Sequence, residues 1–399
     1  GLGDVYKRQI TETGGTTSHS AILARALEIP AVLSVEGVAS SLKNGDTVVV
    51  DGSEGAVIVN PDDNTVAEYS KKRDAFLAER KELENYRGRE TKSASGEVYE
   101  LFCNIGKPED AVKAVDADGE GVGLFRTEFL FMDRTSIPTE DEQFEAYKKA
   151  ALILKGKSLI IRTLDIGGDK DIPYLGLEKE ENPFMGFRAI RYCLKNRELF
   201  KSQIKAILRA SAFGDIKIMF PLITTMDELR EGKKLVAECK ADLRNMGINF
   251  NENIQVGVMV ETASAAVIAD MLAKEADFFS IGTNDLTGYT MACDRGNNDV
   301  SYLYSPLQPS VLRMIKRTIE CGVQNGISVG MCGEAAANKL MIPLLISFGL
   351  TEFSVSAPSV LNVRKIISTW TKEEADKVTA KVLEMSTQQE IVEYLKSVV

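Results

Sequence analysis

Short apolar runs alternate with amphipathic stretches over most of the chain, from about residue 98 to the C-terminus. Eight of these runs have the length and apolar character of buried strands, at residues 99–105, 122–126, 158–164, 216–222, 254–261, 278–285, 327–334 and 352–357. The stretches between them carry apolar residues at helical spacing, for example at 140–154, 225–246, 263–274 and 309–325. These repeats predict an α/β fold, a closed (β/α)8 TIM barrel over residues 98–399.

An open, doubly wound parallel sheet is the alternative fold for alternating strands and helices. Such a sheet rarely needs eight strand–helix units, and it usually carries a Gly-rich fingerprint directly after its first strand. No such fingerprint follows residues 99–105. The closed barrel is therefore the preferred interpretation.

The region before the barrel has two parts. Residues 10–60 are Gly-rich, with strand-like runs at 31–34, 47–51 and 56–59 and a helical pattern over 18–27, which indicates part of a small β/α domain. Residues 61–97 are rich in Lys, Arg and Glu with few large apolar residues, which predicts a solvated linker helix. Residues 1–9 (GLGDVYKRQ) follow no period, and we expect them to be a non-native junction.

Composition narrows the class of protein. Hydrophobic residues make up 44% and charged residues 27% of the 399 residues, as in ordinary soluble globular proteins. The net charge of -10, without a basic cluster, argues against a nucleic-acid partner. No apolar run approaches the roughly 20 residues of a membrane span. The six cysteines are scattered without a CxxC pair, so we expect neither disulfides nor a zinc site, and a cytoplasmic location.

Polar residues cluster where the predicted strands end, which in a parallel barrel is where ligands bind. These residues are Arg126, Glu128, Arg162, Asp165, Glu261, Asn284, Asp285, Cys332 and Glu334, whereas the strand interiors read as apolar. Convergent arginines suit a small, multiply anionic ligand, because guanidinium groups bind phosphate and carboxylate through paired hydrogen bonds. Glu261 and Asp285 are hard oxygen ligands, and as a pair among arginines they favour Mg²⁺, although either carboxylate alone could form a salt bridge.

His19 is the only histidine in the chain and follows the sequence GGTTS at residues 14–18. The glycines allow a tight turn, and Thr17 or Ser18 can cap a helix that begins at His19. A helix start favours an anion, such as a phosphoryl group on the imidazole. From the residues alone, a structural or merely exposed histidine is the commoner reading of this position.

Taken together, six segments resemble the Enzyme I family of the bacterial sugar phosphotransferase system, from about Ile10 to the C-terminus. They are GGTTSHSAILAR (14–25), GVGLFRTEFLFMDR (121–134), IIRTLDIGGDK (160–170), ENPFMGFRAIR (181–191), IGTNDLTGYTMACDRGN (281–297) and GMCGEAA (330–336). The resemblance implies a swivelling phosphohistidine domain, partial here, ahead of the linker helix and a phosphoenolpyruvate-binding barrel. It also implies a homodimer formed through the barrel.

The resemblance implies a role for each matching residue. His19 falls on the phosphorylated histidine, and Cys332 falls on the group that protonates the methylene carbon as pyruvate forms. The positions that contact phosphoenolpyruvate correspond to Arg126, Arg162, Arg188, Asn284 and Arg295. Glu261 and Asp285 fall on the Mg²⁺ ligands. Thr16, where relatives often have a basic residue, and Ala263, where proline is usual, depart from the family pattern.

Members of this family carry further upstream residues, which complete the histidine domain and dock the histidine phosphocarrier protein. We therefore expect an N-terminally truncated member, which binds phosphoenolpyruvate and Mg²⁺ but fails to pass phosphate to that carrier. Two other interpretations remain open from the sequence. One is a fragment of pyruvate phosphate dikinase or phosphoenolpyruvate synthase, and the other is a barrel that senses phosphoenolpyruvate without catalysis.

Overall fold

The computed structural model describes residues 8–12, 24, 29–132, 134–167 and 172–399. The chain forms two compact units, Gly1–Asn85 and Tyr86–Val399.

The first unit contains the short strands that the sequence predicts before the barrel. β1 (Gln9–Ile10) pairs in parallel with β2 (Ala31–Val32), and β3 (Val48–Asp51) pairs antiparallel with β4 (Ala56–Val59). α2 (Val38–Ser41) lies between these pairs in sequence. The helix predicted over residues 18–27 falls almost wholly outside the described residues.

A long solvated helix, α3 (Asp63–Leu83), ends the first unit. It begins after Asp62, whose side chain accepts a hydrogen bond from the Thr65 backbone N–H at 2.7 Å. None of its residues is buried, in keeping with its charge-rich sequence.

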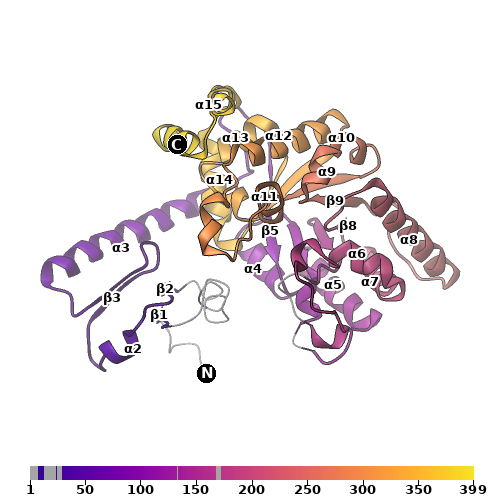
Figure 1. Ribbon diagram of the computed structural model, residues 1–399, viewed down its shortest axis with the longest axis horizontal. Helices are drawn as coiled ribbons and strands as arrows, with labels where there is room; N and C mark the ends of the chain where they lie inside the picture. Colours follow the sequence, from indigo (N-terminus) through magenta and orange to yellow (C-terminus); the bar gives the residue numbers. More distant parts are fainter. Residues whose placement is uncertain (1–7, 13–23, 25–28, 133, 168–171) are drawn as a thin grey trace. The chain divides into compact units, whose positions relative to one another are not determined.

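The second unit is a closed barrel of eight parallel strands with helices around it (Figure 1). The strands are β5 (Glu100–Ile105), β6 (Val122–Arg126), β7 (Leu159–Arg162), β8 (Ile216–Phe220), β9 (Val256–Val260), β10 (Phe278–Gly282), β11 (Ser328–Cys332) and β12 (Glu352–Val355). β12 closes the barrel by pairing with β5, with Glu352 in register with Glu100. The (β/α)8 prediction is confirmed, and the open-sheet alternative is wrong.

Helices follow the strands as the amphipathic pattern indicates. They are α4 (Asp110–Asp116), α5 (Glu140–Leu154), α6 (Ala189–Lys195), α7 (Arg197–Ala210), α8 (Met226–Asn245), α9 (Ala263–Val267), α10 (Ala269–Leu272), α11 (Thr283–Met291), α12 (Pro309–Gln324), α13 (Ile342–Phe348), α14 (Val360–Thr369), α15 (Lys372–Glu384) and α16 (Gln388–Val398). Thr139 and Thr225 start α5 and α8 with capping boxes. The helix predicted over 263–274 is two helices, because Ile268 (φ −95°, ψ 18°) departs from helical geometry.

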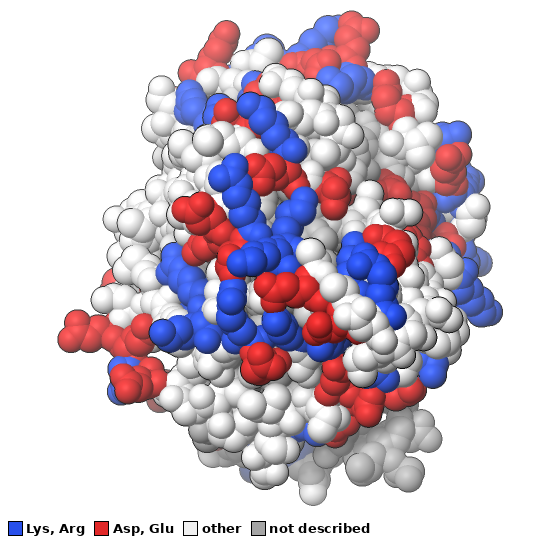
Figure 2. All heavy atoms as spheres, turned by 90° about the vertical axis from the view of Figure 1, so that its right-hand side faces the viewer, with Lys and Arg blue, Asp and Glu red and all other residues white. Residues whose placement is uncertain are grey.

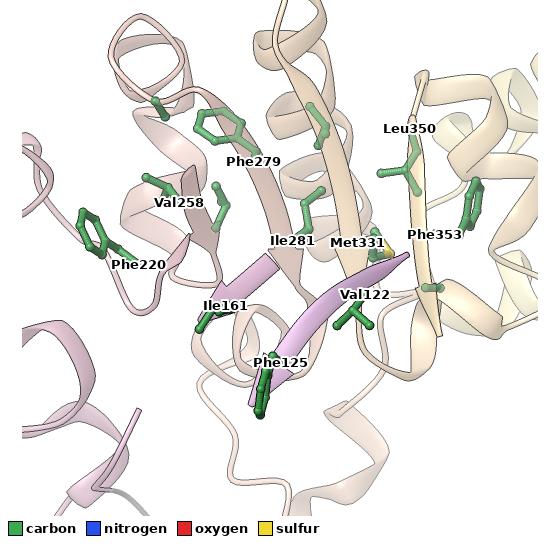
Figure 3. Close-up of a cluster of buried hydrophobic side chains, with 14 of the residues drawn as sticks. Val122, Phe125, Ile161, Phe220, Val258, Phe279, Ile281, Met331, Leu350 and Phe353 are labelled. Carbon is green, nitrogen blue, oxygen red and sulfur yellow. The ribbon is translucent and has the colours of Figure 1, made fainter. Parts of the chain in front are cut away.

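Side chains that alternate along the strands divide the core into two layers. The outer layer lies between the strands and the helices, and Figure 3 shows part of it, including Phe125, Ile161 and Phe279. The inner layer fills the barrel itself and consists of Leu124, Ile160, Met219, Met259, Phe278 and Cys332. Cys332 therefore lies inside the barrel, at the carboxyl end of β11.

The buried charged side chain of Glu352 departs from the apolar character predicted for the strands. Glu352, the first residue of β12, is only 5% exposed. A Cβ atom on Gly123 would lie 2.3 Å from its Oε1, and one on Gly330 would lie 2.9 Å from its Cδ. These two glycines, on β6 and β11, leave the space that the buried carboxyl group occupies.

Buried Arg364 on α14 fixes the beginning of the barrel unit. Its guanidinium group donates to the Tyr86 carbonyl at 3.1 Å, to the Thr91 hydroxyl at 3.0 Å and to the Asp118 carbonyl at 2.9 Å, and it also pairs with the Asp118 carboxylate. These contacts explain why the compact unit begins at Tyr86, ahead of the boundary at residue 98 that the strand pattern suggested.

Ion pairs link the outer helices. α7 presents Lys201 and Lys205 to Glu238 and Asp242 of α8, each at 2.7 Å. Arg197 pairs with Glu231 in the same row. Figure 2 shows acidic and basic side chains interspersed on this side of the molecule. Each exposed pair contributes little to stability, because water screens it.

The last helices pack within the barrel unit, as their amphipathic pattern allows. α15 lies against α13 and buries Ala375, Val378 and Val382, and α16 buries Ile391 and Leu395.

Candidate active site

The carboxyl ends of the strands bring together most of the polar residues that the sequence singles out. Arg126 and Arg162 end neighbouring strands and are in register with each other. Glu261 directly follows β9, and Asn284 and Asp285 lie in the first turn of α11, directly after β10. Because all eight strands are parallel, these ends form one rim of the barrel.

Arg162 lies in the barrel mouth with its side chain 8% exposed. It donates to Glu128 at 2.8 Å and to Asp165 at 3.0 Å. Burial alone would lower the pKa of Arg162, but these carboxylates raise it above its ordinary value, so the group is a fixed positive charge. Its buried Nε has no hydrogen-bond partner among the described residues.

Arg188, which precedes α6, forms a second buried ion-pair centre. Its Nε and Nη2 atoms bind Asp165 at 2.9–3.2 Å, and Nη2 also lies 3.2 Å from Asp285. Burial lowers the pKa of Arg188, and the two carboxylates more than reverse this effect. Gly167 makes the close packing possible: its φ is +111°, and a Cβ atom there would lie 2.5 Å from Cβ of Arg188.

Glu261 is a buried carboxyl group in a negative environment. Its Oε1 accepts a hydrogen bond from the Leu222 backbone N–H at 2.7 Å. Burial, followed by the charges of Asp285 and Asp165, raises the pKa of Glu261 to about 8, although nearby arginines oppose the shift. A Cβ atom on Gly282 would lie 2.6 Å from Oε2, so this glycine leaves room for the carboxylate.

Cys332 presents a protonated thiol to the same region. Its Sγ lies 3.7 Å from the Ile281 carbonyl, and the residue is 3% exposed. Burial raises the pKa of the Cys332 thiol to about 11, with partial opposition from Arg162. The thiol therefore carries its proton at neutral pH.

The other expected ligand contacts come from loops after the strands. Arg295 is exposed, and its guanidinium carbon lies 6.0 Å from the ring centroid of Phe184. The guanidinium carbon of Arg188 lies 5.8 Å from the same centroid. The Asn284 side-chain oxygen lies 3.6 Å from the place that a Cβ atom on Gly333 would occupy, beside the end of β11. Ion pairs through Asp165 thus connect Arg162, Arg188 and Asp285, while Arg126 shares the rim through strand register.

His19, the candidate phosphoryl acceptor, lies outside the described residues. Three residues of the contact network were not assigned a role from the sequence: Glu128 and Asp165, which were placed only at strand ends, and Tyr289, which was not singled out. Tyr289 accepts a hydrogen bond from Nη1 of Arg188 at 3.2 Å. Its spacing of four residues from Asp285 on one helix is the signal that could have identified it.

Two family matches and several similar proteins point to the same family over most of the chain. Residues 9–55 match the family described as PEP-utilising enzyme, mobile domain, and residues 80–371 match PEP-utilising enzyme, PEP-binding domain. The chain is 51% identical over 386 residues to the phosphoenolpyruvate-protein phosphotransferase of Bacillus subtilis (strain 168), covering 97% of this chain and 68% of that protein. The protein of the same name from Staphylococcus carnosus (strain TM300) is 48% identical over 387 residues, with the same coverage.

Proposed function

The chain belongs to the phosphoenolpyruvate-protein phosphotransferases, and we propose that its barrel rim binds phosphoenolpyruvate and passes the phosphoryl group to His19, with release of pyruvate. The chain is accordingly an enzyme, with phosphoenolpyruvate as phosphoryl donor and a histidine nitrogen as acceptor. The family relationship favours this interpretation over a dikinase or synthase fragment and over a non-catalytic sensor.

The strongest structural support is the buried guanidinium of Arg162 at the barrel mouth. A buried donor without a partner is costly, and a ligand oxygen at its Nε would satisfy it. Arg188 lies in the same network through Asp165. Two buried, permanently charged guanidinium groups favour a compact ligand that carries more than one negative charge. Phosphoenolpyruvate, with a phosphate and a carboxylate, is such a ligand.

In this proposal Arg126, Arg162, Arg188 and Arg295 grip the phosphate and carboxylate of phosphoenolpyruvate, and Asn284 contacts the ligand. The bond between phosphorus and the enol oxygen breaks, and its electron pair stays with the pyruvate enolate. A bond forms between phosphorus and a nitrogen of His19. The arginines stabilise the charge that develops on the phosphoryl and enolate oxygens.

Mg²⁺ fits the residues that are present. The contact network around Asp165 joins two guanidinium groups to three carboxylates, those of Glu128, Asp165 and Asp285. Glu261 lies in the electrostatic field of the same groups, so the carboxyl groups outnumber the guanidinium groups. Burial is the main cause of the raised pKa of Glu261, the charges of Asp285 and Asp165 add to it, and a nearby cation would oppose it. The described residues contain no group of three or more His, Cys, Asp or Glu arranged to hold a metal ion. Glu261 and Asp285 would therefore hold Mg²⁺ together with oxygens of the ligand or of water. The ion would stabilise the developing enolate as a Lewis acid.

Cys332 supplies the proton that completes the reaction. Its thiol is protonated at neutral pH and lies inside the barrel, next to the rim. Transfer of the Sγ proton to the methylene carbon converts the enolate to pyruvate, and the resulting thiolate regains a proton from solvent.

Incubation with [³²P]phosphoenolpyruvate and Mg²⁺ tests the proposal. We expect label that is stable to base and labile to acid, as for a phosphohistidine, and no label in His19→Ala. Because His19 is the only histidine, any such label is assigned without peptide mapping. Binding of phosphoenolpyruvate without labelling under any condition would favour a sensor, and absence of binding would refute the proposal.

Two further parts of the proposal concern the protein that accepts the phosphoryl group and the location of the enzyme in the cell. We propose that, where the upstream docking residues are present, the phosphoryl group continues to the histidine phosphocarrier protein for sugar uptake, and that the enzyme acts in the cytoplasm. All six cysteines are free thiols, as in a reducing compartment. In the described ranges, no helix is both long and apolar enough to cross a bilayer.

We also propose a homodimer formed through the barrel. Val267, at the end of α9, and Met271, on α10, are about half exposed and lie beside the Arg317–Asp270 ion pair. Sedimentation at micromolar concentration, with Mg²⁺ and phosphoenolpyruvate present, tests it. A single monomeric species would refute this assembly.

A further inference from the structure

Tyr289 contacts Arg188 and the loop that precedes it. It lies on α11, one turn after Asp285, so both side chains face Arg188. Its hydroxyl accepts a hydrogen bond from Nη1 of Arg188 at 3.2 Å and donates one to the backbone carbonyl of Phe184. One phenol group thus binds a ligand-gripping residue and the loop before it.

The hydrogen bonds of Arg188 show what Tyr289 controls. A guanidinium group has five N–H bonds: one on Nε and two on each terminal nitrogen. Asp165 engages Nε and Nη2, and Asp285 also binds Nη2. Tyr289 engages Nη1. In the described chain, one N–H of Nη1 then remains for a ligand, and Tyr289 determines where it points.

Phe184 extends this arrangement to Arg295. The Phe184 ring lies within 6.0 Å of the guanidinium carbons of both Arg188 and Arg295, a separation that permits cation–π attraction. Glu180 holds the two ends of the same loop together, because its carboxylate accepts a hydrogen bond from the Phe187 backbone N–H at 3.0 Å. The loop position therefore depends on Glu180 and on the Tyr289 hydroxyl.

We propose that Tyr289 is a positioning residue for phosphoenolpyruvate binding, which orients Arg188 directly and Arg295 through Phe184. This inference rests on the proposed function of the barrel rim. It predicts that the Tyr289 hydroxyl affects ligand affinity mainly through the Nη1 atom of Arg188, with a smaller contribution through Phe184 and Arg295, and not through the stability of the fold.

Calorimetric titration of the full chain with phosphoenolpyruvate in Mg²⁺ buffer tests this role. We expect Tyr289→Phe to weaken binding about 3- to 10-fold, the effect of one or two hydrogen bonds, with an unchanged thermal midpoint. Tyr302→Phe is the matched control, since Tyr302 is 71% exposed, and it should bind as the wild type does. Phe184→Leu is a second test. It removes the ring that lies near both Arg188 and Arg295, and it should also weaken binding.

A double-mutant cycle separates positioning from a general structural effect. Lysine at position 188 has no Nη1 atom, so Tyr289→Phe should lose most of its effect in the Arg188→Lys background. Equal affinities of Tyr289→Phe and the wild type would overturn the inference, as would the same fold-loss in both backgrounds. Failure of the wild-type chain to bind phosphoenolpyruvate would instead refute the proposed function.

Discussion

The carboxyl group of Glu352 makes the stability of the barrel depend on pH. It is buried inside the barrel between Gly123 and Gly330, and its Oε1 has no hydrogen-bond partner among the described residues. Burial, followed by the charge of Glu100, raises its pKa from 4.5 to about 8, and Lys217 opposes this shift. The folded protein therefore keeps Glu352 protonated at pH values where the unfolded chain has already lost that proton.

The sign of the effect follows from proton binding. Between pH 4.5 and about 8 the folded state binds one more proton at Glu352 than the unfolded state does. Stability is then fully present below pH 4.5 and falls as the pH rises towards 8. At about 1.4 kcal/mol per pKa unit, the loss from this one group can reach roughly 5 kcal/mol.

Glu352→Gln removes this titration while keeping the shape of the side chain. We expect the variant to unfold with nearly the wild-type free energy at pH 5 and to exceed the wild type by roughly 2–4 kcal/mol near pH 8. Urea unfolding followed by circular dichroism in metal-free buffer, at several pH values from 5 to 9, measures the difference. Glu261, whose pKa is also raised to about 8, is present in both proteins, so its contribution largely cancels.

Glu384→Gln, a substitution on the exposed end of α15, is the matched control and should leave the pH dependence unchanged. Parallel pH profiles for the wild type and Glu352→Gln would refute the reasoning. Such a result would mean that Glu352 is ionised in the folded barrel and stabilised there by Lys217.

Three further substitutions test the site and its support. Cys332→Ala should bind phosphoenolpyruvate within about twofold of the wild type but slow the protonation of pyruvate, measured as single-turnover pyruvate release; equal losses of affinity and rate would indicate a structural thiol. Arg364→Met should lower the free energy of urea unfolding by about 3–5 kcal/mol, because it leaves the Asp118 carboxylate without its buried partner; a change below about 1 kcal/mol would mean that the Arg364 contacts do not stabilise the barrel unit. Asp285→Asn should weaken Mn²⁺ binding, measured by electron paramagnetic resonance, and should lower the pKa of Glu261 by removing a like charge; unchanged Mn²⁺ affinity would place the ion elsewhere.

The sequence by itself determined the architecture of the barrel. The eight apolar runs contain the eight strands, because a strand buried on both faces must be apolar along its length. The rim could also be located, since parallel strands place their carboxyl ends at one end of a barrel. Arg126, Arg162, Glu261 and Cys332 were identifiable on this ground, before any contact was known.

Only the tertiary structure decided which of these charges are paired and what their pKa values are. Asp165 binds Arg188 from 23 residues away, and Asp285 binds it from 97 residues away. Glu352 reads as an ordinary polar strand start, yet two glycines on other strands create its buried site. Burial and electrostatic environment depend on neighbours that the fold brings together, and no local pattern in the chain specifies them.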